Sequence, residues 1–573
     1  MLDDKSLIDC LVKDKVLART EAEEVLQAAK TTRKPVASIL VEKNLSTEDQ
    51  IAEAKANLLN LPFIKLKNIT IRKDILNLIS EPIASSHQII AFDRTDKTIK
   101  IATLDPDDLQ TFEFIRKQTG MTLEIYLTTP DDLKEVLKMY HKSLKAEFEE
   151  LTIPQASEDD TKLKELAQDL PIVRIVDTLL EYAIFEEASD IHIEPAEKEV
   201  AVRYRIDGIL RDVMTLPKKT QSGIIARIKI LANLKLDEHR LPQDGRFKIT
   251  TNEYRISFRV SIIPVFDGEK VVLRLLNESA QVLTLEQLGF SGKAYEEVRA
   301  NISKPHGMIL VTGPTGSGKT TTLYTILNIL NTPNVNITTV EDPIEYRMPR
   351  VNQSQVSPKI GYTFAAGLRA FLRQDPNIIM VGEIRDNETA DIAVNAAMTG
   401  HLVLSTLHTN DAATAFPRLQ DMQIPSFLIA STVNLVIAQR LARKICQNCK
   451  EEYTLGEETI KELETQFDLS AIIRLLTEEK LVNSPKENFE RITFWRGQGC
   501  KQCNQDGYKG RVGLYEVLPL SQSLSQLILK RASAEEIAEA AVKEDMRTMV
   551  MDGFLKAKKG ITSIEELLRV TKE

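Results

Sequence analysis

The chain has 573 residues, of which 43% are hydrophobic and 27% are charged. This composition is ordinary for a folded protein and excludes a wholly disordered chain, while the length suggests about four domains of roughly 150 residues. Lys and Arg total 74 against 83 Asp and Glu, a net charge of −9, which argues against a protein that mainly coats nucleic acid. Because we find no membrane-spanning apolar run and no secretory signal, we expect a cytosolic protein that reaches any membrane through a partner.

The first 60 residues contain two similar units that are both expected to be helical. Leu11 of the first unit corresponds to Leu40 of the second, about 29 residues later. Ser46 to Asp49 has the capping-box pattern that opens a helix. Two copies form a small helical module rather than a solenoid, which needs three or more repeats.

The following regions alternate helices with strands. Residues 61–140 predict a small α/β part, and the polar stretch after it reads as a linker. A long helix is expected from about residue 170, and the alternation between 305 and 435 is typical of a parallel α/β sheet. The strands expected outside that sheet are 89–92, 99–101, 200–205, 255–260 and 271–275.

The strongest motif is Gly313–Thr320, which fits the phosphate-binding pattern G-x-x-x-x-G-K-[ST] at every fixed position. An apolar strand precedes it and a helix-forming run follows it, which is the context that such a loop needs. Glycines let successive backbone N–H groups face one anion, and the new helix adds its positive end. Lys319 is expected to reach the β- and γ-phosphates, and Thr320 to ligate Mg²⁺. The residues expected to bind the nucleotide here are Gly313, Pro314, Thr315, Gly316, Ser317, Gly318, Lys319, Thr320 and Thr321.

Two acidic segments follow apolar strand runs. The run at 378–381 is followed by Gly382 and Glu383, and the run at 337–340 is followed by an acidic segment that includes Glu345. Carboxyl ends of parallel strands meet at one edge of a sheet, so these acids are candidates to order Mg²⁺ and the attacking water. Because Gly382 replaces the Asp that usually ends this strand motif, Glu383 is expected to act on the metal alone. The plainer alternative is that these acids cap helices.

Two histidines, His401 and His408, flank another apolar strand run at 402–404. A histidine at the end of such a strand is suited to hydrogen-bond a γ-phosphate and report its presence. Taken alone, a histidine in this position is more often a structural hydrogen-bonding group.

Four of the five cysteines form two C-x-x-C pairs, Cys446 with Cys449 and Cys500 with Cys503. Each pair supplies two thiolates from one tight turn, and four thiolates give a closed tetrahedral site suited to structural Zn²⁺. The insertion of about 50 residues between the pairs is expected to be helical. The alternatives are unliganded thiols or a redox pair, and Cys10 is left over as a core residue.

Taken together, these and further stretches resemble the type II secretion and type IV pilus assembly ATPases, a family of hexameric motors. The resembling stretches run in order from about residue 170 to 520, and the N-terminal 140 residues resemble the N-terminal extension of that family more loosely. The stretches are 188–195 (ASDIHIEP), 205–208 (RIDG), 241–246 (LPQDGR), the phosphate loop, 340–345 (VEDPIE), 372–377 (LRQDPN), 382–386 (GEIRD), 399–408 and 510–516 (GRVGLYE).

The resemblance implies an α/β multidomain subunit of a six-membered ring, with a PAS-like domain hinged to a RecA-like P-loop ATPase domain. The expected parts are an N-terminal extension at 1–145 (helical repeat plus small α/β part), a linker at 146–168, the PAS-like domain at 169–280, the RecA-like domain at 281–435, a tetracysteine zinc-binding element at 436–520 and a C-terminal helical region at 521–573.

The resemblance also implies residue roles. Glu345 would orient or deprotonate the attacking water, Glu383 would support Mg²⁺, and His408 would belong to the family's histidine box. Arg259 and Arg274, on strands of the PAS-like domain, match arginines that reach a γ-phosphate of their own or a neighbouring subunit. Further arginines that match positions near the same site are Arg369, Arg373 and Arg385. A planar cation delivered by domain closure can be worth roughly 10³–10⁵ in rate, whereas the plainer alternative for each arginine is a salt bridge.

The implied function is ATP hydrolysis that drives the assembly of type IV pilins, or of secretion pseudopilins, through an inner-membrane platform protein. The expected cofactors are ATP, Mg²⁺ and Zn²⁺. A retraction motor is disfavoured because retraction relatives lack the long N-terminal extension and the tetracysteine insertion. A non-hydrolysing scaffold is disfavoured by the intact Lys319, Thr320, Glu345 and Glu383, and a DNA translocase by the acidic balance of the chain.

In some relatives, repeated helical units like those at the N-terminus bind cyclic di-GMP through an Arg-Leu-Gly start and a later glycine. Lys15 and Asn44 stand where that glycine is expected, and no Arg-Leu-Gly opens either unit. We therefore expect a module that docks onto an inner-membrane partner rather than a receptor for cyclic di-GMP.

Overall fold

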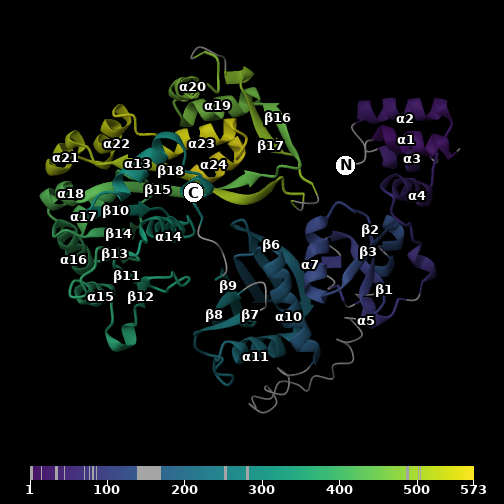
Figure 1. The fold of residues 1–573 in the computed structure, drawn as a ribbon, viewed down its shortest axis with the longest axis horizontal. Coiled ribbons are helices and arrows are strands. Elements are labelled where there is room, and N and C mark those ends of the chain that lie inside the picture. The colour runs from purple at the N-terminus through teal and green to yellow at the C-terminus, as the bar shows by residue number, and fades with distance from the viewer. Residues whose placement is uncertain are drawn as a thin grey trace. The chain divides into compact units, whose positions relative to one another are not determined.

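The computed structural model describes residues 4–572 apart from 15, 33–35, 44, 70, 77, 80–82, 85–86, 134, 138–169, 251–254, 279–282, 485–488, 501–502 and 504. The predicted linker at 146–168, and Lys15 and Asn44, therefore lie outside the described residues. The chain forms two compact units (Figure 1). The first comprises Met1–Phe247 and Phe258–Leu275, and the second comprises Lys248–Ser257 and Leu276–Glu573. None of the described helices combines the length and the apolar character that a membrane span requires.

The first unit begins with four helices, α1 (Asp4–Lys13), α2 (Arg19–Thr32), α3 (Val36–Glu42) and α4 (Glu48–Leu59). Leu11 and Leu40, the equivalent residues of the two predicted units, are both fully buried in one apolar cluster. Helix α4 is capped one residue later than predicted. Thr47 rather than Ser46 accepts the backbone N–H of Gln50, and the Gln50 side chain returns to the Thr47 N–H at 3.0 Å.

A small three-stranded sheet follows these helices, as the alternation within residues 61–140 predicts. Its order is β1 (Ile89–Arg94), β2 (Thr98–Thr103), β3 (Thr122–Leu127). Strand β2 is antiparallel to β1 and parallel to β3. Helix α7 (Leu109–Thr119) provides the crossover that a parallel pair requires. The short helices η1 (Leu66–Asn68) and α5 (Lys73–Leu76) precede the sheet.

A six-stranded sheet with the order β6-β5-β4-β9-β8-β7 comes next. Its elements are α10 (Leu170–Phe185), β4 (Asp190–Pro195), β5 (Glu199–Ile206), β6 (Ile209–Pro217), η2 (Lys218–Thr220), α11 (Gln221–Leu231), β7 (Gln243–Thr250), β8 (Arg255–Val265) and β9 (Gly268–Asn277). The strands predicted at 200–205, 255–260 and 271–275 lie within β5, β8 and β9. The buried Tyr204 hydroxyl on β5 donates to the carbonyl of Leu179 at 2.6 Å, which attaches α10 to the sheet.

The second unit is built on a seven-stranded sheet with the order β12-β11-β13-β14-β10-β15-β18. The strands are β10 (Gly307–Thr312), β11 (Ile337–Glu341), β12 (Val351–Gln355), β13 (Ile378–Val381), β14 (Leu402–Leu407), β15 (Val433–Ile445) and β18 (Tyr508–Pro519). All neighbours are parallel except β18, which is antiparallel to β15. Because β15 and β18 complete this sheet, it continues beyond residue 435, where the RecA-like part was predicted to end. The carboxyl ends of the parallel strands meet at one edge.

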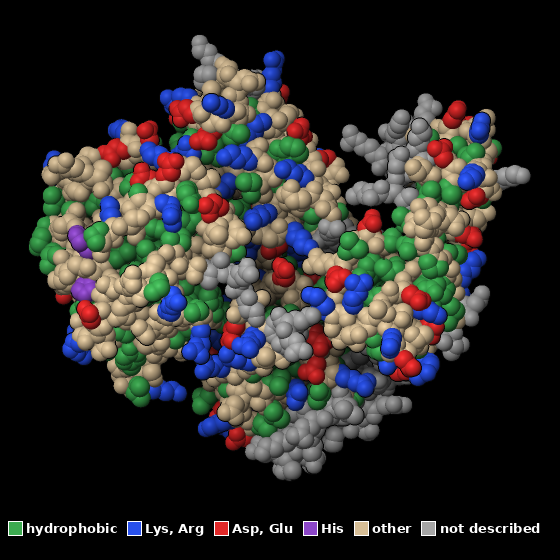
Figure 2. Space-filling model, in the orientation of Figure 1, with side chains coloured by type: hydrophobic (Ala, Val, Ile, Leu, Met, Phe, Trp, Pro, Cys, Tyr) green, Lys and Arg blue, Asp and Glu red, His purple; other side chains and the backbone are tan. Residues whose placement is uncertain are grey.

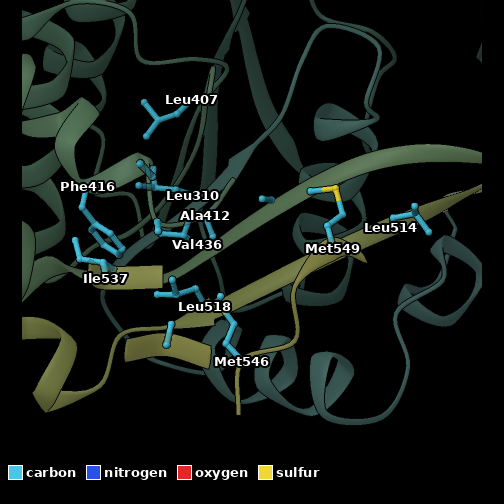
Figure 3. Close-up of a cluster of buried hydrophobic side chains, with 14 of the residues drawn as sticks. Leu310, Leu407, Ala412, Phe416, Val436, Leu514, Leu518, Ile537, Met546 and Met549 are labelled. Carbon is cyan, nitrogen blue, oxygen red and sulfur yellow. The ribbon is translucent and has the colours of Figure 1, made fainter. Parts of the chain in front are cut away.

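Helices cover both faces of this sheet. On one face α12 (Leu285–Leu288), α13 (Gly292–Ile302) and α14 (Lys319–Leu330) form an apolar cluster that includes Ile309 and Val311 of β10. The other face packs a cluster that includes Leu310 against α15 (Phe364–Phe371), α16 (Asn387–Met398), α17 (Ala415–Asp421) and α18 (Ser426–Thr432). Successive strand side chains point to opposite faces, so β10 serves both cores. Figure 3 shows part of the second cluster, with Leu310 and Phe416 drawn together with Ile537 of a C-terminal helix.

The insertion between β15 and β18 is not wholly helical, contrary to expectation. Strands β16 (Lys450–Thr454) and β17 (Thr493–Gly497) pair antiparallel around α19 (Glu457–Gln466), α20 (Leu469–Glu478) and η4 (Phe489–Arg491). Tyr453 pairs with Phe494 across these strands, and aromatic residues favour such pairing. The last four helices confirm the predicted helical C-terminus. They are α21 (Gln522–Leu529), α22 (Ala534–Lys543), α23 (Met549–Lys558) and α24 (Ile564–Lys572).

Candidate nucleotide-binding site

The predicted phosphate loop connects β10 to α14 at the carboxyl edge of the seven-stranded sheet. Gly313, Gly316 and Gly318 have φ angles of 146°, 82° and 88°, which residues with a Cβ rarely adopt. The Nζ atom of Lys319 donates to the carbonyl groups of Gly313 and Pro314 at 2.8 and 3.0 Å. The Lys319 amine therefore lies next to the loop, and both are predicted to bind the phosphates of the nucleotide.

Ser317 is buried within this loop, and among the described residues its Oγ atom has no hydrogen-bond partner. The atom lies 2.7 Å from the position that a Cβ at residue 313 would take, so the glycine there leaves room for it. Buried polar atoms are rarely left without partners. This hydroxyl and the N–H groups of the loop therefore suit an anion such as the phosphate chain of a nucleotide.

Glu383 lies just beyond β13, and its side chain is only 13% exposed. One carboxylate oxygen lies 2.6 Å from Nε of Arg385 and 3.2 Å from Nε2 of His408. The residues on either side of Glu383 are both hydrogen-bonded to Thr406 of β14, at 2.7 and 3.0 Å. Burial lowers the pKa of the Lys319 amine, whereas the charge of Glu383 raises it, so the two groups are within electrostatic reach of each other.

The end of β10 is tied to the segment that carries His408. The hydroxyl oxygens of Thr312 and Thr409 are 2.6 Å apart, and the Thr409 N–H donates to the Thr312 hydroxyl at 2.9 Å. Both threonines are buried. The adjacent strands β13, β14 and β10 thus bring Glu383, His408 and the phosphate loop to the same edge of the sheet.

Glu345 is positioned through a buried set of hydrogen bonds that the sequence did not reveal. Its backbone N–H donates to the hydroxyl oxygen of Tyr324 on α14 at 3.4 Å, and that hydroxyl donates to Glu341. The other oxygen of Glu341 accepts from Thr339 at 2.5 Å and from Gln353 at 3.2 Å. Burial raises the pKa of Glu341 despite these bonds. Nothing in the local sequence marks Tyr324 or Gln353, because the contacts form only once α14 packs against β11 and β12.

Comparison with known proteins identifies the family. Residues 165–569, more than half of the chain, match the family described as Type II/IV secretion system protein, and residues 59–147 match the MshEN domain. The chain belongs to the Type II/IV secretion system protein family. The predicted resemblance to type II secretion and type IV pilus assembly ATPases is confirmed.

Relatives of this family match over most of the chain. The chain is 37% identical to the type IV pilus assembly ATPase PilB of Myxococcus xanthus over 98% of both chains. It is 46% identical to the type II secretion system ATPase E of Vibrio cholerae over 72% of this chain and 77% of that one. The solved ATPase DotB of Yersinia pseudotuberculosis shares the fold at a TM-score of 0.51 and 23% identity, over 70% of this chain and 93% of that one. The multidomain α/β prediction is confirmed.

The arginines that match this family's motifs in the second unit have different surroundings. Arg385 contacts Glu383, as described above. Arg369 on α15 pairs with Glu388 on α16 at the surface, and Arg373 donates to the carbonyl of Arg369 at 2.9 Å. Arg369 thus makes the salt bridge of the plainer alternative, whereas Arg373 contacts a backbone carbonyl, and a role of either at the nucleotide stays a prediction.

The two arginines predicted to act from the PAS-like domain both lie in the first unit. Arg259 is exposed on β8. Arg274 on β9 is 54% exposed, and its Nε atom lies 3.0 Å from Asp190 on β4. Arg205 contacts the other oxygen of Asp190 at 3.4 Å. The relation of Arg259 and Arg274 to the γ-phosphate stays a prediction.

The four predicted zinc ligands form a cluster in which all four sulfur atoms lie within 4.8 Å of one another. The Sγ–Sγ distances are 3.7 Å for Cys446–Cys500, 3.8 Å for Cys449–Cys503 and 3.6 Å for Cys500–Cys503. Tetrahedral zinc with Zn–S bonds of about 2.3 Å requires about 3.8 Å between sulfurs, whereas a disulfide requires about 2.05 Å. Burial opposes ionisation of Cys503, but N–H groups of Cys500 and Gly507, both at 3.2 Å, lower its pKa. Burial raises the pKa of the Cys449 thiol to about 12, so it is the spacing of the four sulfur atoms that fits Zn²⁺.

Proposed function

We propose that this chain is a motor that hydrolyses ATP to ADP and phosphate and thereby drives the assembly of type IV pilus subunits, or of type II secretion pseudopilus subunits. One observation carries the proposal. The phosphate loop, which carries Lys319, follows strand β10, and Glu383 and His408 follow the adjacent strands β13 and β14 at the same edge of the sheet. The family relatives that match this chain are named pilus assembly and secretion ATPases.

The proposed chemistry assigns each group a task. Lys319 and the loop N–H groups hold the β- and γ-phosphates, and Thr320 and Glu383 hold Mg²⁺, which neutralises charge on the phosphates. Glu345 orients the attacking water and accepts its proton. Water attacks the γ-phosphorus as the bond to the bridging oxygen breaks, and ADP leaves with that electron pair. His408 and Arg385, which contact Glu383, respond to the presence of the γ-phosphate.

The wider arrangement is also part of the proposal. Six subunits form a ring, and the six-stranded sheet of each is the PAS-like domain that presents Arg259 and Arg274 to a γ-phosphate of its own or a neighbouring subunit. Arg369 and Arg373 act near the same site, and the four cysteines hold a structural Zn²⁺. The ring works at the cytoplasmic face of the inner membrane on a platform protein, with the N-terminal module as a docking element rather than a cyclic di-GMP receptor.

A nucleic-acid partner is not part of the proposal. A basic stripe is the usual footprint of nucleic-acid binding. On the face that Figure 2 shows, Lys and Arg side chains are mixed with Asp and Glu and form no such stripe. The assembly role is favoured over retraction because the likeness to the pilus assembly ATPase spans 98% of both chains and so includes the N-terminal region.

The test is Mg²⁺-dependent ATP hydrolysis by the purified full chain, with Lys319→Ala as the matched variant. Equal turnover by the two proteins would reject the motor. A deletion strain scored both for surface fibres and for exported protein separates pilus assembly from secretion.

A further inference from the structure

Strand β15 approaches the phosphate loop at the point where β10 ends. Ala438 of β15 lies opposite Thr312, the last residue of β10, so Gln439 comes next to the first residue of the loop. The Gln439 carbonyl oxygen lies 2.4 Å from the position of a Cβ at residue 313. Only glycine can pass so close to this strand. The backbone pairing of β15 with β10 stops here, and a side chain takes its place.

The Gln439 side chain, which is 1% exposed, connects the loop to the helix behind it. Its Nε2 atom donates to the carbonyl of Ser317 in the loop at 2.6 Å. Its Oε1 atom accepts from the hydroxyl of Thr322, in the first turns of α14, at 2.7 Å. A carbonyl only accepts and this hydroxyl must donate to the amide oxygen, so the partners fix the orientation of the amide.

The bond to Ser317 determines which way the next peptide group points. In a trans peptide the C=O and the following N–H point in opposite directions within one plane. With the Ser317 carbonyl held toward the Gln439 amide, the N–H of Gly318 points away from that side chain. This N–H is one of those that a phosphate-binding loop directs at its anion.

Gln439 is a polar side chain in a row of apolar side chains on one face of β15. Side chains two apart on a strand share a face, and Leu435 and Ile437 on this face belong to the apolar core beneath α14. Leu441 continues the row, with its methyl groups 3.6 Å from the Cβ position of residue 318. An amide in an apolar row loses its contacts with water and must recover them from the loop and from α14.

We propose that Gln439 is a positioning residue for phosphate binding, because it holds the Ser317–Gly318 peptide in the orientation that accepts the β-phosphate of ADP or ATP. The inference rests on the proposed nucleotide site. In this proposal β15 holds the phosphate loop in its binding conformation before any ligand binds. The same strand ends next to the tetracysteine cluster.

The first test replaces Gln439 by Met, which has a similar length and makes neither hydrogen bond. We expect the dissociation constants of Mg-ADP and of inorganic pyrophosphate, measured by calorimetry on the full chain, to rise about ten-fold or more. Turnover at saturating ATP should change less than about three-fold, because the chemical groups are untouched. The matched control is Thr562→Val, which removes another fully buried hydrogen bond, from Thr562 to the Arg443 carbonyl at 2.8 Å. Binding by Q439M within two-fold of wild type, or an equal loss in T562V, would overturn the proposal.

The second test uses Q439E and changes only the pH. A neutral carboxylic acid reproduces both bonds, since its O–H donates to Ser317 and its C=O accepts from Thr322, whereas a carboxylate loses the first. Burial raises the pKa of a carboxyl group toward neutrality. We therefore expect ADP affinity of Q439E, relative to wild type at the same pH, to recover between pH 8 and pH 6, with no such recovery in Q439M. A ratio of Q439E to wild type that does not change with pH would overturn the proposal, and this ratio can be measured even if Q439M fails to fold.

The proposed function and this inference fail in different ways. Loss of ADP binding in Lys319→Ala together with wild-type binding in Q439M would leave the nucleotide site intact and remove only the role of Gln439. Absence of ADP binding by the wild-type chain would remove both.

Discussion

The Nε2 atom of His408 lies 3.2 Å from a carboxylate oxygen of Glu383, although 25 positions separate the two residues in the chain. Strands β13 and β14 are parallel neighbours, with Val381 opposite Ser405, so the residues that follow the two strands arrive at the same place. Arg385 contacts the same oxygen at 2.6 Å. The Glu383 carboxylate is thus held between Arg385 and His408, and its charge acts on Lys319 of the phosphate loop.

Replacing Glu383 by Gln removes this charge while keeping the shape of the side chain. We expect turnover to fall about 100-fold or more, with ADP affinity changed less than about five-fold, because the amide no longer supports the metal. Steady-state ATPase assays and calorimetry check this. Wild-type turnover in E383Q would contradict the role of Glu383. The helix-capping alternative does not apply to this residue, because Asp386 caps α16.

The Tyr324 hydroxyl connects Glu341 to the backbone of Glu345. Tyr324→Phe removes these two bonds and the one from Gln353 at 3.3 Å. We therefore expect the free energy of unfolding to fall by about 1–3 kcal/mol and turnover to fall about ten-fold because Glu345 loses its support. The matched control is Tyr346→Phe, on the ring that packs edge-on against Tyr324 with centroids 4.6 Å apart. Urea denaturation and ATPase assays measure the two effects. Equal turnover in the two variants would show that Tyr324 does not position Glu345.

The tetracysteine cluster predicts about one Zn²⁺ per chain, because its four sulfurs have the spacing of a tetrahedral site. Cys503→Ser, or removal of metal by a strong chelator, should lower the zinc content and the melting temperature together. The matched control is Cys10→Ser, since Cys10 packs among the N-terminal helices. Atomic absorption and thermal denaturation check this, and a metal-free chain of unchanged stability would refute the zinc site.

We expect the stability of the first unit to depend on pH through His87. Burial lowers the pKa of His87, but Asp108, 2.8 Å from Nδ1, and Glu186, 3.7 Å from Nε2, outweigh burial and raise the pKa to about 9. The folded value exceeds the unfolded value of about 6.5, so this stabilisation is complete below pH 6.5 and is lost as the pH rises through 9. The full loss corresponds to about 3 kcal/mol.

The measurement for His87 is amide hydrogen exchange of α10, which ends next to Glu186, between pH 7 and 9.5. After correction for the intrinsic rate, exchange should accelerate with pH in the wild type and less in His87→Gln, which is neutral throughout. The same acceleration in both proteins would show that the charge of His87 does not hold α10.

Arg259 is expected to act on hydrolysis rather than on binding. Arg259→Ala should reduce turnover at least about 100-fold with a smaller loss of ATP affinity, because a planar cation stabilises the charge of the departing phosphate. Arg255→Ala is the matched control, since Arg255 is exposed on the same strand and, four residues away, on the same face. A loss of binding without a loss of turnover per bound nucleotide would refute this role.

The local patterns of the chain were sufficient for several strands of the central sheet, for the phosphate-loop motif and for the two cysteine pairs. The phosphate loop was recognisable because glycines, a lysine and a threonine are needed at set positions within eight consecutive residues, and the two C-x-x-C pairs because each forms within one turn. Strands of the central sheet are continuous apolar runs, and they were predicted directly before the phosphate loop and at 337–340 and 378–381. The cap of α4 was misplaced by one residue because serine and threonine can both cap a helix and Ser46 and Thr47 are adjacent.

Only the tertiary structure decided which distant side chains touch. Gln439 reaches Ser317 and Thr322 because β15 lies beside β10 in the sheet, and Tyr324 reaches Glu341 because α14 packs on the sheet next to β11. The pairing of Arg274 with Asp190 and of Arg369 with Glu388 depends in the same way on neighbouring elements. A hydrogen bond depends on a few tenths of an ångström and on direction, and no periodicity along a chain carries that information.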